Sequence, residues 1–292
     1  MTRFARIVLC AIVLTSLAAQ SPTEATTATV VRITHTSKWK VPSPDPSGIT
    51  YYPKIHRLLI SDSAVDNTHV WHHRNLFYVG LKGRLRSTGS LTKATFNPVG
   101  IAWNWKARCL YVVDDNADAV YRFGRGRDGR LGTKDDPAKR IIYTEHFGFT
   151  QPHGVAWRPK KDTLIIVDSA LRRVYKFHRG KDRRFGTNDD IVSSFGVGKY
   201  GLTHPEGIAY DGVTDHLFIV SDSQNFILVT TMKGRLVKKI DLTATGINRP
   251  SALTFAPGSG GQRHHLYVTD RGVNYTVDPN ENDGRLFELR LG

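Results

Sequence analysis

The stretch PHGVAWRPKKDTLIIVDSALRRVYKF, residues 152–177, is the clearest copy of a unit that the chain repeats five times. Within it, GVAW alternates, so Val155 and Trp157 share one face of a strand. The polar segment RPKKDT predicts a turn, LIIV predicts a buried second strand, and RRVYKF begins a third. No segment has the length and 3.6-residue period of a helix, so we expect an antiparallel meander.

Five prolines open the copies, at intervals of 52, 54, 53 and 45 residues: Pro46, Pro98, Pro152, Pro205 and Pro250. A fixed period in this range indicates a repeat architecture. Each proline is followed by an aliphatic residue three positions on and an aromatic residue five positions on, with a small residue between them. This pattern suits an inner strand packed closely between neighbouring sheets. We therefore predict an all-β fold, a single β-propeller of five four-stranded blades, with six blades as the alternative.

The two ends of the chain predict how this ring closes. TVVRITHTSKW, residues 29–39, alternates weakly and precedes the first repeat, while the last repeat ends in GRLFELRLG, one strand short. We expect the N-terminal strand to complete the final blade, because closure removes an exposed sheet edge.

The segment before this strand predicts export. Arg3 and Arg6 precede an apolar run that is too short to span a membrane, so residues 1–19 are interpreted as a secretory signal peptide. Residues 20–28 then form a polar leader, and residues 29–292 form the propeller domain. We accordingly expect a secreted, extracellular or periplasmic protein without a transmembrane segment in the mature chain. Removal of Cys10 with the signal leaves Cys109 alone, which excludes an internal disulfide.

The charge balance favours an anionic partner. The chain has 41 Lys and Arg against 26 Asp and Glu, a formal net charge of +15. A solvated basic surface is the favoured interpretation, and an anionic polymer or a glycan as the extracellular ligand is the alternative. Nucleic acid is not favoured, and a monomer is expected.

The repeat resembles a known family. The P-x-G-[IV]-[AT] opening followed by LYVxD resembles the bacterial NHL-type propellers, which are related in architecture to the gluconolactonase and strictosidine-synthase-like groups. The segments DGRLGTKDD and LYVTDRGVNYTVDPNENDGRLFEL are similar to those of secreted bacterial repeat proteins. The resemblance covers residues 46–292 and implies the architecture rather than the activity, because propellers carry many functions.

In such propellers the residue between the proline and the glycine tends to face the mouth of the central channel. His153 and Glu206 occupy this position in neighbouring repeats, with His204 close by. A carboxylate and an imidazole can hold a divalent metal or act as a base, so these three are the catalytic candidates. Glu206 resembles the glutamate of gluconolactonase-like enzymes, but no matching Asn and Asp partners are found.

Aspartates recur near the ends of the second strands, at Asp62, Asp115, Asp168, Asp222 and Asp270. We interpret them mainly as acceptors for backbone N–H groups of the next turn, with a ring of acidic ligands as the alternative. The two GTxDD loops, residues 124–136 and 178–190, are interpreted as structural hairpins, because glycine stands where calcium would need its first acid.

The insertion at residues 270–284 is the candidate metal site. It places many hard oxygens in one loop, which suits calcium, although an exposed polar loop would have the same composition. The candidate ligands are Asp270, Asp278, Asn280, Glu281, Asn282 and Asp283.

Two functions remain open. The first is a secreted propeller that binds or scaffolds an extracellular partner. The second is a divalent-metal-dependent hydrolase of the lactonase or phosphoesterase kind, which would use Glu206, His153 and a bound ion to activate water. The chain contains no GxSxG, HExxH, phosphate-binding loop or Ser/His/Asp signature that would favour another enzyme class.

Overall fold

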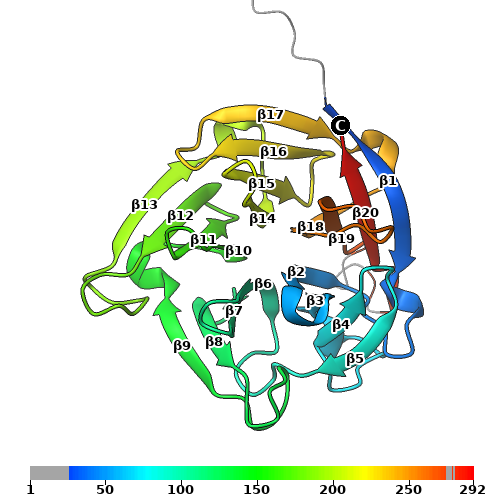
Figure 1. The fold of residues 1–292 in the computed structure, drawn as a ribbon, viewed down its shortest axis with the longest axis horizontal. Helices are drawn as coiled ribbons and strands as arrows, with labels where there is room; N and C mark the ends of the chain where they lie inside the picture. The colour runs from blue at the N-terminus through cyan, green and yellow to red at the C-terminus, as the bar shows by residue number, and fades with distance from the viewer. Residues whose placement is uncertain (1–25, 274–277, 279) are drawn as a thin grey trace, which may run out of the picture.

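The computed structural model describes residues 26–273, 278 and 280–292, which form β-sheets arranged around a central axis (Figure 1). The expected signal peptide lies outside these residues. The described part contains no α-helix, and nothing in it is helical over enough apolar residues to cross a membrane. It has six short 3-10 helices: η1 (Thr36–Lys38), η2 (Pro53–Ile55), η3 (Val65–Asn67), η4 (Thr144–Phe147), η5 (Gly198–Tyr200) and η6 (Thr243–Thr245).

Three of the sheets have four antiparallel strands that follow one another in sequence. The first contains β2 (Pro46–Tyr52), β3 (Arg57–Asp62), β4 (Leu76–Gly80) and β5 (Leu85–Gly89). The second contains β6 (Pro98–Asn104), β7 (Cys109–Asp114), β8 (Ala119–Gly124) and β9 (Ala138–Tyr143). The third contains β10 (Pro152–Arg158), β11 (Thr163–Asp168), β12 (Arg173–His178) and β13 (Ile191–Gly196). Each is the meander that the repeat predicts.

The remaining strands form one eight-stranded sheet, in the order β14-β15-β16-β17-β1-β20-β19-β18. Its strands are β14 (Pro205–Asp211), β15 (His216–Ser221), β16 (Phe226–Thr231), β17 (Leu236–Asp241), β18 (Pro250–Ala256), β19 (His265–Asp270), β20 (Arg285–Leu291) and β1 (Thr26–His35). The expectation of five separate four-stranded sheets is therefore corrected to four sheets. The physical reason is that β1 hydrogen-bonds on both sides and joins two groups of strands.

The pairing of β1 with β20 confirms that the N-terminal strand completes the last repeat. The two strands are antiparallel, from Ala28 opposite Leu291 to His35 opposite Arg285, with an irregularity near Val30. The strand begins at residue 26 and ends at residue 35, earlier than the expected 29–39, because residues 36–38 turn into η1. Its first two residues pair in parallel with β17, so β1 has partners on both sides, and β20 lies between β1 and β19.

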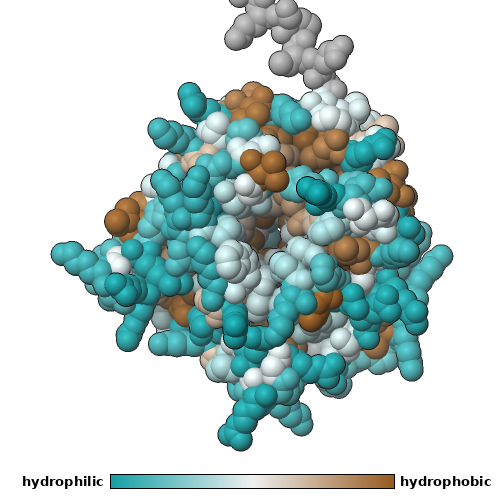
Figure 2. All heavy atoms as spheres, viewed as in Figure 1, coloured by the Kyte–Doolittle hydropathy of each residue, from teal (hydrophilic) through white to brown (hydrophobic). Residues whose placement is uncertain are grey.

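Five inner strands surround the axis, and each packs against the next in a closed ring: β2, β6, β10, β14 and β18. Glycine makes this close approach feasible. A Cβ atom added to Gly154 would collide with the carbonyl oxygen of Glu206, and one added to Gly100 would collide with that of His153. Figure 2 shows this face of the molecule hollowed at its centre.

The hydrophobic core lies between neighbouring sheets. Ile101 and Trp103 of β6 pack with Leu59 of the preceding sheet, whereas Ala102 faces Val155 of the following one. The large pair and the small residue of each repeat thus fill opposite interfaces, as the sequence pattern predicts. Buried Cys109 belongs to the same core.

Candidate functional site

At one end of the axis, equivalent positions of the five repeats converge on a cavity of about 510 Å³, here called the mouth pocket. The residue before each proline lines it: Asp45, Asn97, Gln151, His204 and Arg249. So does the residue that follows each second strand: Ser63, Asp115, Ser169, Asp222 and Arg271. Every inner strand begins with a register shift at its proline, and such irregularities re-aim side chains.

The structure brings the three catalytic candidates, His153, Glu206 and His204, to this pocket. The side chains of His153 and Glu206 are buried, and that of His204 is exposed. The backbone N–H of His204 donates to the Ser221 hydroxyl at 3.2 Å, which anchors the chain just before β14.

Arg271 holds the centre of the site. Its guanidinium lies 2.8 Å from an Oε of Glu206 and 3.2 Å from an Oδ of Asp45, and all three residues are more than nine-tenths buried. Burial raises the pKa of Asp45 and of Glu206, and Arg271 opposes that rise. Burial also opposes the charge of Arg271, but the two carboxylates outweigh it and raise the pKa of the guanidinium. Two carboxylates from distant repeats therefore share one permanent cation.

His153 forms a second polar group with Asp115. Its Nε2 lies 3.4 Å from Asp115 Oδ2, and the Asn97 amide donates to the other oxygen of that carboxylate. Burial lowers the pKa of His153 to about 4, although Asp115 acts in the opposite direction. The imidazole is therefore neutral at pH 7, which leaves one ring nitrogen able to accept a proton.

The pocket is acidic in a basic protein. Asp222 pairs with Arg249 at 2.9 Å. Five carboxyl groups line the cavity against two guanidinium groups: Asp45, Asp66, Asp115, Glu206 and Asp222 against Arg249 and Arg271. Phe96 adds an apolar surface at the edge, with 54% of its surface exposed.

The carboxyl and imidazole groups of the mouth pocket do not form a ligand set that fits a divalent metal ion. A divalent ion bound between Glu206 and Asp45 would have to displace the buried guanidinium of Arg271, which already neutralises them. His153 faces Asp115 instead of joining Glu206 as a ligand. The mouth pocket therefore lacks a ligand set for a catalytic metal ion among the described residues.

The aspartate of the 270–284 insertion that ends β19 has a structural role. Asp270 is fully buried and accepts hydrogen bonds from the Arg249 backbone N–H at 2.7 Å and from the Arg285 guanidinium at 2.5 Å. Asn282 donates its amide to the Ser37 carbonyl at 3.3 Å. Asp270 is therefore held by other contacts, whereas the Oδ1 of Asn282, the atom that could bind calcium, has no hydrogen-bond partner among the described residues.

The other insertion candidates also have local partners. Asp283 accepts from the Val273 backbone N–H at 3.0 Å, and Asp278 accepts from that of Asn280 at 2.9 Å. Burial, together with the neighbouring carboxyl groups of Asp45 and Asp283, raises the pKa of Glu281 to about 9, so its carboxyl group is neutral at pH 7 when no cation is bound. Residues 274–277 and 279 lie outside the described part of the chain. Calcium binding by the insertion stays a prediction.

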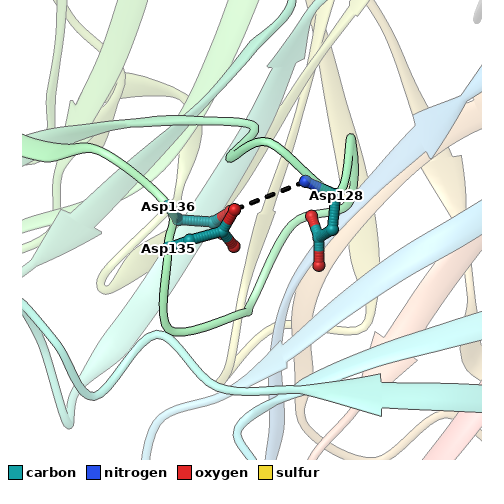
Figure 3. A group of neighbouring side chains, drawn as sticks. All are labelled: Asp128, Asp135 and Asp136. Carbon is teal, nitrogen blue, oxygen red and sulfur yellow. Dashed lines mark hydrogen bonds between the residues drawn. The ribbon is translucent and has the colours of Figure 1, made fainter.

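The GTxDD loops are closed by their own carboxylates. Asp128, Asp135 and Asp136 lie together (Figure 3), close enough to suit a cation. Asp136 accepts from the Gly132 backbone N–H at 2.6 Å, and Asp135 accepts from that of Asp128 at 3.3 Å. These bonds shape the hairpin. Each of the two loops also places one apolar side chain in the core between two sheets, Leu131 in the first loop and Phe185 in the second. This geometry supports the structural interpretation.

The repeated aspartates divide into two kinds. Asp168 accepts backbone N–H groups of the neighbouring turns, as expected. In the second repeat Asp114 does so, which leaves Asp115 for the pocket. In the fourth repeat Ser221 takes the strand-end position and Asp222 faces the pocket. The sequence interpretation missed this one-residue offset, and with it Arg271, although aligning the residue after each strand end would have revealed both.

Comparisons with known proteins agree with this architecture. Residues 136–271 match a family model described as the SMP-30/Gluconolactonase/LRE-like region. The glutaminyl cyclase of Myxococcus xanthus is similar in structure, with TM-score 0.59, 13% identity and coverage of 91% of this chain and 97% of that chain. A PQQ-bound aldose sugar dehydrogenase from Streptomyces coelicolor gives TM-score 0.55, 13% identity and coverage of 93% and 100%. Among curated proteins, none matches the sequence.

Proposed function

We propose that this β-propeller of the gluconolactonase-like type binds a small neutral polyhydroxylated molecule, a sugar or a sugar lactone, in its mouth pocket. The observation that carries the proposal is the cavity of about 510 Å³ crowded with buried carboxylates and guanidinium groups. Its size lies in the range of small-molecule sites.

We also count the eight-stranded sheet as two blades, which makes five, because five inner strands contribute equivalent positions to the pocket. The N-terminal signal-peptide pattern supports action outside the cytoplasm.

The chemistry of the lining favours hydroxyl groups. The buried Oδ1 of Asp222 has no hydrogen-bond partner within the described residues, which favours a ligand that brings hydroxyl donors to the pocket. The excess of carboxylates disfavours an anionic ligand. Phe96 offers a flat apolar surface for the C–H face of a sugar ring.

Calorimetry with neutral sugars, sugar lactones and the matching sugar acids tests this proposal. We expect saturable binding of a neutral member and weaker binding of its acid. Phe96→Ala should weaken binding about tenfold, because it removes the apolar platform. Trp105→Ala is the matched control, since Trp105 is similarly exposed, at 53%, but does not line the pocket. Equal effects of the two variants, or tighter binding of the acids, would contradict the proposal.

Hydrolysis of a bound lactone is a second candidate function, favoured by the Asp115–His153 pair. With Nε2 protonated toward Asp115, Nδ1 of His153 can take a proton from water as the water oxygen bonds to the lactone carbonyl carbon. The ring C–O bond then breaks, and the leaving oxygen receives the proton to give a hydroxy acid. Arg271 and Arg249 supply donors for developing negative charge.

The pH profile distinguishes this activity from binding alone. His153 accepts a proton only above its pKa of about 4, so the hydrolysis rate should rise with pH through about 4 and level off toward neutrality. His153→Gln should lower the rate about 100-fold or more while retaining lactone binding. A rate that is unaffected by this variant, or that rises only near pH 6.5, would rule out His153 as the base.

A further inference from the structure

A second cavity, of about 490 Å³, lies on the outer part of the propeller beside β8 and β9. Six cationic side chains line it, and no carboxylate does: Arg122, Lys139, Arg140, Arg179, Arg183 and Arg184. We call this surface the basic cleft. Three of its cations come from the second sheet and three from the 178–190 loop of the third, so the cleft requires the two sheets to be packed together.

The cations of the second sheet are crowded by the strand register. Arg122 and Lys139 stand directly opposite each other in β8 and β9, and both are exposed. Like charges at opposed positions of an antiparallel pair destabilise it. Arg140 is next along the strand, over the ring of Tyr121, and donates to the Tyr121 hydroxyl at 3.0 Å. An anion placed between Arg122 and Lys139 would relieve the repulsion of this pair.

The third sheet adds an oriented arginine. The guanidinium of Arg179 lies over the ring of Phe185 and donates to the Tyr111 hydroxyl at 3.3 Å. Asp162 lies 3.1 Å from one end of the guanidinium, and this is the single ion pair of the six cations within the described residues. The buried Nε of Arg179 has no hydrogen-bond partner there. These contacts fix the orientation of the guanidinium while leaving a donor uncommitted.

The acidic residues of the 178–190 loop form no ion pair with the cleft cations within the described part of the chain. Asp190 accepts from the Gly186 backbone N–H at 2.6 Å, and Asp189 accepts from that of Asp182 at 3.0 Å. Asp182 in turn accepts from the Arg184 backbone N–H at 2.8 Å. The loop carboxylates thus serve the hairpin backbone, and the arginine side chains remain available.

We propose that the basic cleft binds a ligand carrying closely spaced phosphate or sulfate groups. Guanidinium groups match the oxygens of such anions bidentately, and several converging forks give charge-assisted hydrogen bonds that one surface lysine cannot. The cavity can hold a compact diphosphate or a disulfated sugar unit. This site is independent of the acidic mouth pocket, so the protein presents opposite electrostatic preferences at two places.

Calorimetry at low salt with inorganic pyrophosphate and with a highly sulfated oligosaccharide tests the proposal. The variant Arg122→Gln/Lys139→Gln should weaken binding about tenfold or more. Lys233→Gln/Arg235→Gln is the matched control, because it removes the same charge from an exposed hairpin outside the cleft. The cleft variant should melt no lower than the wild type, since it removes an opposed pair of like charges.

The two probes separate the sources of the anion. Cleft-dependent binding of pyrophosphate alone supports a compact phosphate ligand, and cleft-dependent binding of the oligosaccharide alone supports a sulfated glycan. The absence of saturable binding to either probe overturns the proposal. Equal weakening in the control variant also overturns it, because net charge rather than the cleft would then account for the affinity.

Discussion

An Arg271→Met variant is expected to lose about 3–5 kcal/mol of unfolding free energy at neutral pH. The wild-type guanidinium lies 2.8 Å from Glu206 and 3.2 Å from Asp45, and all three groups are buried. Removing the cation leaves two carboxylates close to each other without compensation, whereas methionine still fills much of the apolar volume. Urea denaturation of the two proteins measures the difference.

The pH dependence of this loss follows from the same two carboxyl groups. Burial already raises the pKa of Asp45 and of Glu206, and loss of Arg271 should raise both further above their unfolded values. A carboxyl group whose pKa is raised on folding does not lower the free energy of unfolding at pH values below its unfolded-state pKa. It lowers that free energy progressively more as the pH rises. The variant should therefore be closer to the wild type at about pH 5 than at about pH 7.5.

The matched control removes the whole cluster. Arg271→Met/Asp45→Asn/Glu206→Gln leaves no buried charge, so it should recover much of the lost stability. A single variant as stable as the wild type at both pH values would mean that Arg271 does not neutralise the mouth pocket.

The architecture could be predicted because the same strand pattern recurs five times in the sequence. The alternation of large and small residues after each proline needs only local geometry, and it correctly assigned Ile101 and Trp103 to one interface and Ala102 to the other. The ring then followed from repetition and from the unpaired strands at the two ends. Joining of two strand groups through β1 could not be predicted, because it depends on two residue pairs, Thr26 with Ile240 and Thr27 with Asp241.

The mouth pocket was predictable only in part. His153 and Glu206 were found because they occupy a repeated position that faces the channel in similar propellers. Arg271 was missed because the position after each second strand holds Ser, Asp or Arg, so residue type does not mark it and only an alignment of the strand ends would have revealed it. Its partners come from repeats far apart in sequence, so the ion cluster exists only once the ring has closed.

A chain beginning at Val41, which lacks β1, is expected to lose its cooperative unfolding transition. The loss removes the ladder with β20 and the packing of Ala28 and Val30 against the core of the eight-stranded sheet. Hydrogen bonds contribute about 0.5–1.5 kcal/mol each, so a ladder of this length is worth on the order of 5 kcal/mol. That is comparable with the whole stability of about 5–15 kcal/mol of an ordinary domain.

Deletion of β1 should also make the protein associate, because it exposes the edge of β20. Without β1, the outer edge of β20 has no partner among the described strands, and an unpaired edge pairs readily with another chain. The shortened protein should therefore associate on heating, as measured by calorimetry together with light scattering. A chain beginning at Thr26 is the matched control and should melt like the full sequence, because it keeps every residue of β1. An unchanged midpoint and width for the chain beginning at Val41 would show that β1 is dispensable for closing the ring.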